Sequence, residues 1–222
     1  MGFEEYFPFW NRLTEGQKEI LGGAITKRTA EKGTVVHHGG VDCVGLLMVI
    51  SGQFRAYITS DEGREITLYR LLSRDMCLFS ASCMLRSIEF DISVEAEQET
   101  EFYHIPVDIY KQLMDESAAV ANYTNDIMSE RFSDVMWLMD QVLYKRMDAR
   151  VAGFLLEESR LEGNDKLTMT HEIMARHLGS AREVVSRILK YLQQEGAIEL
   201  FRGGVQVTDF KKLETLAGDS VR

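Results

Sequence analysis

The sequence LGSAREVVSRIL, at residues 178–189, separates into a polar and an apolar face when it is wound as an α-helix. The polar face holds side chains one, three and four positions apart: Arg182, Glu183, Ser186 and Arg187. Arginine can donate two hydrogen bonds to guanine, glutamate can accept one from cytosine, and serine can bond a base edge or a phosphate. The stretch therefore predicts a recognition helix for the major groove of double-stranded DNA, and nothing in it resembles a catalytic set.

The same residues allow a second interpretation, an amphipathic helix at the protein surface. Glu183 stands three residues after Ser180, the spacing at which two side chains cap the first amides of a helix. In that case Glu183 bonds its own helix and not a base. The segment taken alone leaves both interpretations open, and its surroundings favour the first.

The surrounding segments predict a winged helix-turn-helix. Residues 167–178 have a helical pattern with Thr170 as the expected N-cap, and Gly179 separates this helix from the next. Two short apolar runs, 197–201 and 205–207, then flank Gly203 and Gly204, which permit the backbone angles of a tight hairpin. That hairpin is the expected wing.

Residues 168–207 resemble the winged helix-turn-helix of the Crp/Fnr family of bacterial transcription regulators, most specifically in AREVVSRILKYLQQEGAIEL at 181–200. The resemblance implies that Arg182, Glu183 and Arg187 contact a half-site containing TGA, and that Ser186 is the serine used by Fnr-like members. A palindromic operator with a TGA core follows, while its outer bases stay open. DNA backbone contacts are expected from Thr168, Thr170, Ser180, Lys190 and Arg202, and Arg176 is a further candidate for a phosphate or base contact.

Length and charge fit a protein of two domains. The chain has 222 residues, 45% of them hydrophobic, and a net charge of −10. Residues 146–222 hold 12 basic and 12 acidic side chains, so the whole negative charge lies in residues 1–145, with 13 basic and 23 acidic. An acidic first part repels DNA and confines contact to the C-terminal part. The acidic opening and the lack of a long apolar run predict a cytoplasmic protein without a membrane segment.

The first hundred residues predict an antiparallel sheet structure, because short apolar runs alternate with turn signals. The runs are 33–36, 44–50, 54–58, 65–69, 90–94 and 101–105. The clearest hairpin, 57–66, follows Ile50-Ser51-Gly52, and the segment resembles the β-roll of cyclic-nucleotide-binding domains. The resemblance to the Crp/Fnr family therefore covers nearly the whole chain.

The second half of this roll departs from the family pattern. Nucleotide-binding members have a Gly-Glu pair for the ribose and an Arg-Ser or Arg-Thr pair for the phosphate, and the chain has neither. With Arg74-Asp75 aligned to the usual Gly-Asp, Phe79 falls near the glutamate position and Phe90-Asp91 near the phosphate-binding pair. A carboxylate there repels a phosphate. We therefore expect no binding of cyclic AMP or cyclic GMP.

The segment in place of the missing cassette is DMCLFSASCML at 75–85, expected to form the inner wall of the roll. Cys77 and Cys83 could fill space, form a disulfide or ligate a metal; packing is the commonest role of a free cysteine, and a cytoplasmic disulfide would be a transient redox signal. Three cysteines, the third being Cys43, fall short of the four ligands of an iron–sulfur cluster. The candidate effector or sensor residues are Cys77, Phe79, Ser80, Ser82, Cys83 and Phe90.

A histidine pair, His37-His38, invites a haem or metal interpretation. Adjacent residues of a strand point to opposite faces, so both cannot readily ligate one ion, and we interpret them as polar residues of the surface. We predict no metal site and no cofactor. Because relatives in the family bind haem, aromatic acids or 2-oxoacids in the roll, the resemblance leaves haem, a small apolar or acidic effector, and thiol redox open as the signal.

Residues 117–144 predict one long helix, since they contain neither glycine nor proline. Its apolar positions alternate in steps of three and four and predict a coiled-coil seam of a homodimer, whose two recognition helices meet half-sites one helical turn apart. A helix buried against its own domain is the alternative. The seam residues are Met128, Arg131, Val135, Leu138 and Val142, with a neighbouring acid expected to pair with Arg131.

The predicted protein is of the α+β class, with a β-roll at 1–116, a dimerisation helix and hinge at 117–145, and a winged helix-turn-helix at 146–222. The expected function is a dimeric regulator of transcription, with RNA polymerase as a partner if it is an activator. A thiol enzyme is disfavoured, because no Cys-X-X-Cys or Cys-His arrangement accompanies the cysteines. A ligand-binding or redox-sensing module acting through protein partners would not need Arg182 and Arg187.

Overall fold

The computed structural model describes residues 2–39, 44–84 and 91–221. The chain divides into two compact units, which we call the β-roll unit (residues 1–58 and 68–135) and the helix-turn-helix unit (residues 59–67 and 136–222). One hairpin tip, Thr59–Thr67, therefore belongs to the second unit. The division along the chain falls inside a helix, between Val135 and Met136.

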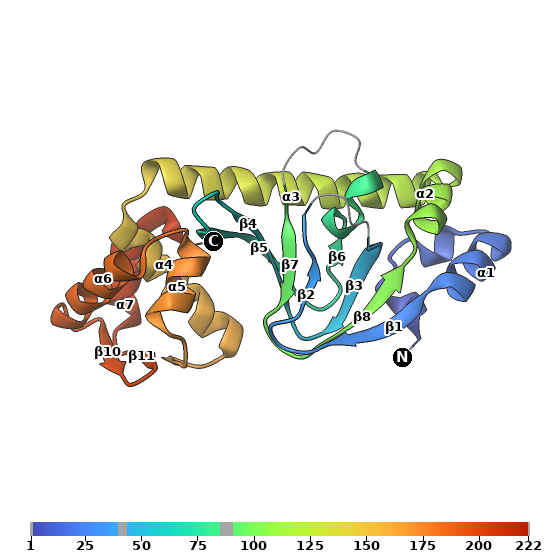
Figure 1. Cartoon of the computed structure of the whole chain (residues 1–222). Helices are drawn as coiled ribbons and strands as arrows, with labels where there is room; N and C mark the ends of the chain where they lie inside the picture. Colours follow the sequence, from blue (N-terminus) through green and yellow to red (C-terminus); the bar gives the residue numbers. More distant parts are fainter. Residues whose placement is uncertain (1, 40–43, 85–90, 222) are drawn as a thin grey trace. The chain divides into compact units, whose positions relative to one another are not determined.

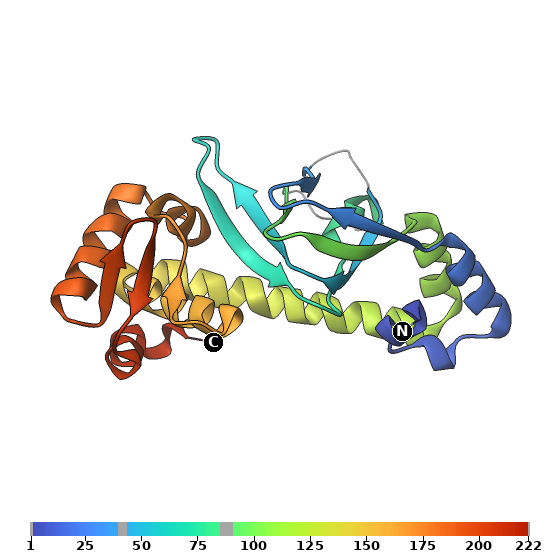
Figure 2. The same ribbon diagram turned by 90° about the horizontal axis from the view of Figure 1, so that it is seen from below.

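The β-roll unit contains two four-stranded antiparallel sheets (Figure 1). One sheet has the order β1 (Thr26–Ala30), β8 (Thr100–Ile105), β3 (Leu46–Ser51) and β6 (Met76–Cys77). The other has the order β2 (Val35–His37), β7 (Ser93–Ala96), β4 (Phe54–Thr59) and β5 (Glu65–Leu71). Figure 2 shows β4 and β5 as one long hairpin. Together with the helices below, these sheets confirm the predicted α+β class.

Each of the six apolar runs contributes residues to a strand, and two further strands of the β-roll unit were not expected from the sequence. Strand β1 has the polar sequence TKRTA, with four exposed residues and only Ala30 buried. It is held by antiparallel pairing with β8, from Thr26 opposite His104 to Ala30 opposite Thr100. Strand β6 has two residues. Both strands are held by hydrogen bonds to a neighbouring strand, β8 for β1 and β3 for β6, and not by a pattern of apolar side chains.

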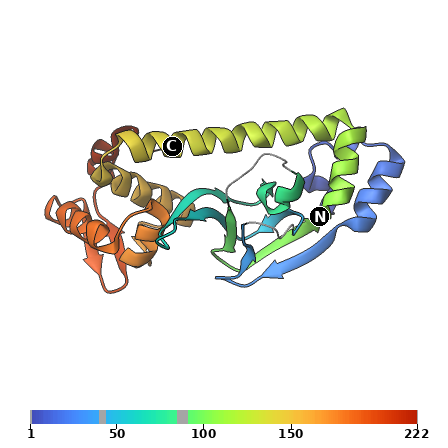
Figure 3. The same cartoon turned by 45° about the horizontal axis from the view of Figure 1, so that its top comes forward.

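Helices α1 (Glu15–Ala24) and α2 (Val107–Glu116) belong to the β-roll unit, and α3 (Ala118–Tyr144) follows α2 after a sharp bend (Figure 3). The unbroken α3 agrees with the long helix expected over 117–144. Short 3₁₀ helices lie at Phe3–Tyr6, Trp10–Arg12 and Phe79–Met84 in this unit and at Gly218–Ser220 in the other. Two apolar clusters fill the unit, one around Leu46 and Tyr110 and the other around Phe54 and Val94.

The helix-turn-helix unit contains α4 (Met147–Glu162), α5 (His171–Leu178), α6 (Arg182–Gln194) and α7 (Phe210–Ala217). Its sheet has the order β10 (Ile198–Phe201), β11 (Gly204–Val207) and β9 (Lys166–Leu167). A single apolar cluster, which includes Leu155, Leu189 and Leu213, packs these elements together. The winged helix-turn-helix expected from the sequence is therefore present.

The turn between α5 and α6 depends on one glycine. Thr170 caps α5, since its hydroxyl accepts from the Ile173 amide at 3.2 Å, and the helix ends at Gly179 with φ of 66°. A Cβ at Gly179 would stand 2.8 Å from Cδ1 of Ile66. Only glycine therefore allows both the left-handed turn and the approach of the β4–β5 hairpin tip.

Candidate DNA-binding interface

Helix α6 presents its polar face to solvent and its apolar face to the core. Arg182, Glu183 and Arg187 are exposed, whereas Val185 and Leu189 are fully buried. The buried row fixes the rotation of the helix, so the charged side chains of the other face all stay accessible. These are the three side chains that the resemblance assigns to base contacts.

Glu183 does not cap its own helix. The N-cap of α6 is Ala181, one residue later than the capping-box interpretation requires, and no side chain bonds the first amides of the helix. Ser180 lies outside the helix and is half-buried. The capping-box interpretation is therefore wrong for this structure, and the Glu183 carboxylate is available to a partner.

Ser186, the fourth candidate, is held by a residue that the sequence did not single out. Its hydroxyl lies 2.8 Å from Nδ1 of His171, the first residue of α5. The two residues are 15 positions apart, and their meeting depends on the angle at which α5 and α6 pack. A sequence pattern could place His171 in the first turn of α5 but could not show this contact.

The candidate backbone contacts lie on three elements. Lys190 is exposed on α6, and Arg202 is exposed at the turn of the β10–β11 wing, next to Gly203 with φ of 89°. Thr168 and Thr170 are exposed ahead of α5, although the Thr170 hydroxyl already caps that helix. With α6, they form a polar surface of the kind that phosphate contacts need.

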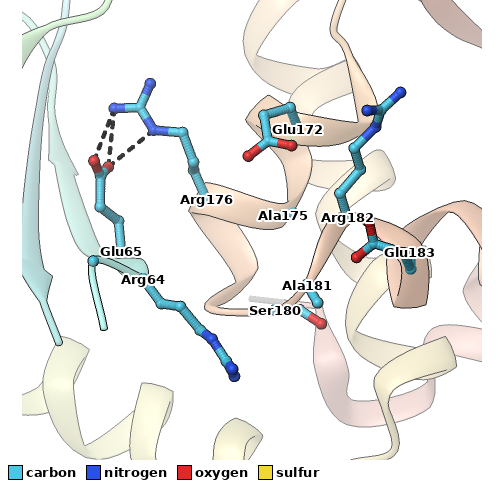
Figure 4. Close-up of a pocket in the computed structure, with 10 residues that line it drawn as sticks. Arg64, Glu65, Glu172, Ala175, Arg176, Ser180, Ala181, Arg182 and Glu183 are labelled. Atoms are coloured by element: carbon cyan, nitrogen blue, oxygen red, sulfur yellow. Dashed lines mark hydrogen bonds and ion pairs between the residues drawn. The ribbon is translucent and has the colours of Figure 1, made fainter. Parts of the chain in front are cut away.

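Arg176 differs from the expectation of a phosphate or base contact. Its guanidinium forms a forked ion pair with Glu65 of the hairpin tip, with Nε–Oε2 and Nη2–Oε1 distances of 3.0 and 3.2 Å (Figure 4). Such two-point pairing holds the guanidinium in one orientation. Thr67 of the same tip bonds Nδ1 of His177 at 2.9 Å. The hairpin tip thus contacts α5 at Arg176 and His177. Arg176 is ion-paired there, whereas the sequence suggested that it was free to contact DNA.

A pocket of about 280 Å³ lies beside this ion pair, at the start of α6. Figure 4 shows Arg64 and Glu65 of the hairpin tip on one side of it and Arg182 and Glu183 of α6 on the other. Three arginines and three glutamates line it: Arg64, Arg176 and Arg182 with Glu65, Glu172 and Glu183. This mixture of charges favours no particular ion.

Burial and charge act on two basic groups of the interface. Burial lowers the pKa of His171, and the positive charges of Arg182 and Lys190 lower it further. Burial also lowers the pKa of Arg150, whose Nη2 donates to the carbonyl of Leu178 at 2.7 Å. Arg150 therefore ties α4 to the last residue of α5 and holds the turn in place.

In the β-roll unit, the segment predicted to contain the sensor is packed into the core. Cys77, Phe79 and Ser80 are buried, and the Ser80 hydroxyl donates to the carbonyl of Gly45 at 2.7 Å. Burial raises the pKa of the Cys77 thiol, the opposite of what a reactive thiolate requires. The side chains of Ser82 and Cys83, and all of Phe90 and Cys43, lie outside the described part of the chain.

Of the two adjacent histidines, His38 is exposed, whereas His37 at the end of β2 is only 2% exposed. The interpretation as surface residues is therefore wrong for His37. Within the described ranges 2–39, 44–84 and 91–221, no group of three potential ligands could hold a metal ion.

A buried polar cluster lies between β5 and α3. Arg131 packs over the ring of Tyr69, with its guanidinium carbon 4.7 Å from the ring centre, and its Nη1 bonds Asp134 at 2.8 Å. The neighbouring acid expected for Arg131 is thus Asp134. Tyr69 Oη and Arg131 Nε are buried without a hydrogen-bond partner among the described residues. Two donors in this cluster are therefore unsatisfied, which is rare in a packed interior.

In helix α3, the residues of the predicted seam differ in exposure. Arg131 is 9% exposed and faces the interior of the β-roll unit, while Met128, Val135 and Leu138 are half-buried and Val142 is exposed. The exposed apolar row lies about a quarter-turn away and repeats in steps of four, three and four: Phe132, Met136, Met139 and Leu143. Arg131 is thus unsuited to a seam, because it is buried and ion-paired with Asp134 inside its own unit.

None of the helices in the described ranges has the length and apolar character needed to cross a membrane.

Comparison with protein families matches both units. A model of the Crp-like helix-turn-helix domain matches residues 149–216, and a model of the cyclic nucleotide-binding domain matches residues 27–117.

Individual relatives extend the match over most of the chain. A crystal structure from Eubacterium rectale, assigned to the Crp/Fnr family of transcriptional regulators, is 54% identical, covers 96% of this chain and 99% of its own, and superposes with a TM-score of 0.93. The cyclic AMP receptor protein of Thermus thermophilus is 26% identical over 95% of this chain and 96% of its own. The transcriptional activator protein anr of Pseudomonas aeruginosa is 27% identical over 86% and 80%. The chain belongs to the Crp/Fnr family of DNA-binding transcription regulators.

Proposed function

We propose that the protein binds, as a homodimer, a palindromic operator with TGA in each half-site, under the control of a signal other than a cyclic nucleotide. The observation that carries the proposal is the exposure of Arg182, Glu183 and Arg187 on one face of α6, with the helix start uncapped by any side chain. Either arginine can donate to guanine and Glu183 can accept from cytosine, so together these side chains can contact a G·C pair and a neighbouring base.

The exposed row of α3 supports the homodimer. Phe132 is 68% and Leu143 62% exposed, unusual for large apolar side chains, with Met136 and Met139 between them. Steps of four, three and four residues match the heptad spacing of a two-stranded coiled coil. A second copy of α3 would cover this row and would give the dimer two recognition helices for the two half-sites of a palindrome.

The interior of the β-roll supports a signal other than a cyclic nucleotide. Phe79, which our alignment places near the glutamate that binds ribose in the family pattern, is buried, and its ring lies 6.1 Å from that of Tyr69. Asp91, aligned with the phosphate-binding pair, is exposed and brings a negative charge. The domain model matched at residues 27–117 describes the fold of this region, and these side chains suit neither ribose nor phosphate.

The unsatisfied donors indicate the chemistry of the effector. Tyr69 Oη and Arg131 Nε lie in one buried cluster and can both donate, so the effector we propose is a small molecule that accepts hydrogen bonds, such as a carboxylic acid. Arg131 belongs to α3, and an effector that bonds it acts directly on the proposed dimer helix. The effector can then control DNA binding only if it binds two arrangements of that helix with different affinity.

A nuclease footprint on the DNA upstream of the protein's own gene tests the operator. We expect protection of two half-sites related by two-fold symmetry, their centres about 10 base pairs apart, each with TGA. A single asymmetric site, or uniform protection without a symmetric pair, would contradict the proposal.

Calorimetric titration tests the signal. Full-length protein should release no binding heat with cyclic AMP or cyclic GMP, and the same experiment with a set of small carboxylic acids should find a ligand whose heat disappears in Arg131→Met. Tight binding of either cyclic nucleotide would overturn this part of the proposal and leave the operator untouched.

A further inference from the structure

We infer that His171 is a specificity-determining positioning residue, whose protonation decides whether the Ser186 hydroxyl donates to a base or accepts from one. This inference rests on the proposed function, because it requires Ser186 to face a base edge. It assigns a role to a residue at the start of α5 that is not itself on the recognition helix.

The geometry places the imidazole within hydrogen-bond distance of the Ser186 hydroxyl. Nδ1 of His171 and Oγ of Ser186 are 2.8 Å apart, the length of a good hydrogen bond, and both residues are half-buried. Ser186 lies between Glu183 and Arg187 in the sequence of α6, one turn after Arg182. The contact therefore restrains Ser186, the one short, neutral side chain among the four residues of the polar face of α6.

The two protonation states of the ring give this hydroxyl opposite roles. A charged imidazole carries hydrogen on both nitrogens, so Nδ1 donates to Ser186 and the hydroxyl hydrogen is free to point at the DNA. A neutral imidazole with its hydrogen on Nε2 accepts the hydroxyl hydrogen at Nδ1 and leaves the oxygen lone pairs for the DNA. The first state suits thymine O4 or guanine O6 and N7, and the second suits the amino groups of adenine or cytosine.

The surroundings set the pH at which the change occurs. Arg182 and Lys190, both on α6, are the charged groups that act on the ring; with burial, they hold the pKa of His171 below its usual 6.5 in the free protein. Glu172, the next residue after His171, lines the pocket at the start of α6 together with Arg182 and Glu183. DNA phosphates favour the charged ring, so the pKa rises in the complex and binding takes up a proton. The affinity for DNA therefore increases as the pH falls from above the pKa of His171 in the complex to below its pKa in the free protein.

The test measures base preference as a function of pH. Fluorescence anisotropy with full-length protein first identifies the half-site position at which Ser186→Ala loses discrimination. The four base pairs at that position are then compared at pH 5.5 and pH 8, each relative to unrelated DNA, so that the general attraction of the phosphates cancels.

We expect the preference of the wild type for thymine or guanine over adenine or cytosine to rise about tenfold on going to the lower pH, the effect of one altered hydrogen bond of about 1.4 kcal/mol. His171→Asn cannot titrate but retains a side chain able to bond the hydroxyl, so its preference should be the same at both pH values. His38→Asn, the matched change at an exposed histidine of the β-roll unit, should behave as the wild type.

Two results overturn the inference while the proposed function stands: a wild-type preference that does not change with pH, or a change that persists in His171→Asn. Failure to distinguish the TGA palindrome from unrelated DNA at either pH overturns the proposed function, and the inference with it. A thermal unfolding curve for His171→Asn that matches the wild type excludes a folding defect as the cause of a lost pH response.

Discussion

At the scale of single residues, the exposed side chains of α6 and the wing divide into two kinds. Arg182, Glu183 and Arg187 carry groups that can distinguish bases, whereas Arg202, exposed at the wing turn, is the proposed contact to the DNA backbone. Base contacts set which sequence is bound, and phosphate contacts set how tightly all sequences are bound. The two kinds are separable by mutation.

Glu183→Ala should relax base choice at one position of each half-site, with a loss of about 1–3 kcal/mol in discrimination against the wrong base. Arg202→Ala should weaken binding to all sequences alike and reduce the slope of log K against log salt by about one unit per subunit. Salt-dependent anisotropy titrations of both variants on the operator and on unrelated DNA measure the two effects. The same profile in both variants would contradict this division.

How far the sequence could predict these residues depends on what each contact requires. The exposure of Arg182, Glu183 and Arg187 follows from helical spacing alone, and the Thr170 cap from local chemistry. The His171–Ser186 contact and the Arg176–Glu65 ion pair join residues 15 and 111 positions apart. Such contacts depend on how helices and a hairpin pack, which no local pattern contains.

At the scale of elements, the α5–α6 turn combines a left-handed backbone with a close contact. Gly179 has φ of 66° and would place a Cβ 2.8 Å from Ile66, whereas Gly196, just after α6, has φ of 70° and open space around it. Comparing alanine substitutions at Gly179 and Gly196 therefore separates the cost of backbone strain from the cost of a steric clash with Ile66.

Gly196→Ala should lower the free energy of unfolding by roughly 1–2 kcal/mol, the cost of a left-handed residue with a Cβ. Gly179→Ala should lower it by that amount and roughly 1–3 kcal/mol more, because Ile66 must move. Urea unfolding of both variants measures the difference. Equal losses in the two variants would show that the hairpin tip does not pack on this turn as described.

The long helix shows a limit of periodicity at this scale. The sequence of α3 contains both a row that faces its own unit, including Val120, Ile127 and Arg131, and the exposed row from Phe132 to Leu143. Both rows repeat in steps of three and four, so periodicity alone does not separate them, and the predicted seam includes Arg131 from the row that faces its own unit. Exposure in the folded structure distinguishes the two.

At the scale of the whole molecule, the proposed dimer depends on that exposed row. Met139→Glu places a charge at the centre of the row and should make the protein monomeric at micromolar concentration, because a buried, unpaired carboxylate is costly. Ser133→Glu introduces the same side chain at an exposed position off the row and should leave the dimer intact. Light scattering after size-exclusion chromatography gives the mass. A dimeric Met139→Glu would place the dimer contact elsewhere.

The charge distribution also belongs to this scale. The −10 net charge resides in residues 1–145, while residues 146–222 are balanced and carry Arg182, Arg187, Lys190 and Arg202 as exposed cations. Repulsion of DNA from the acidic part leaves these cations as the favourable surface for contact. This distribution was fully predictable from the sequence, because it requires no knowledge of packing.

The most direct test of the base-contacting face is the ratio of two affinities at physiological salt. Wild-type protein is titrated against a palindrome with TGA in each half-site and against the same DNA with both TGA triplets scrambled. We predict binding to the palindrome at least about a thousandfold tighter, the lower range for specific DNA-binding proteins, and a loss of most of that ratio in Arg187→Ala. Equal affinity of the wild type for both DNAs would contradict the account.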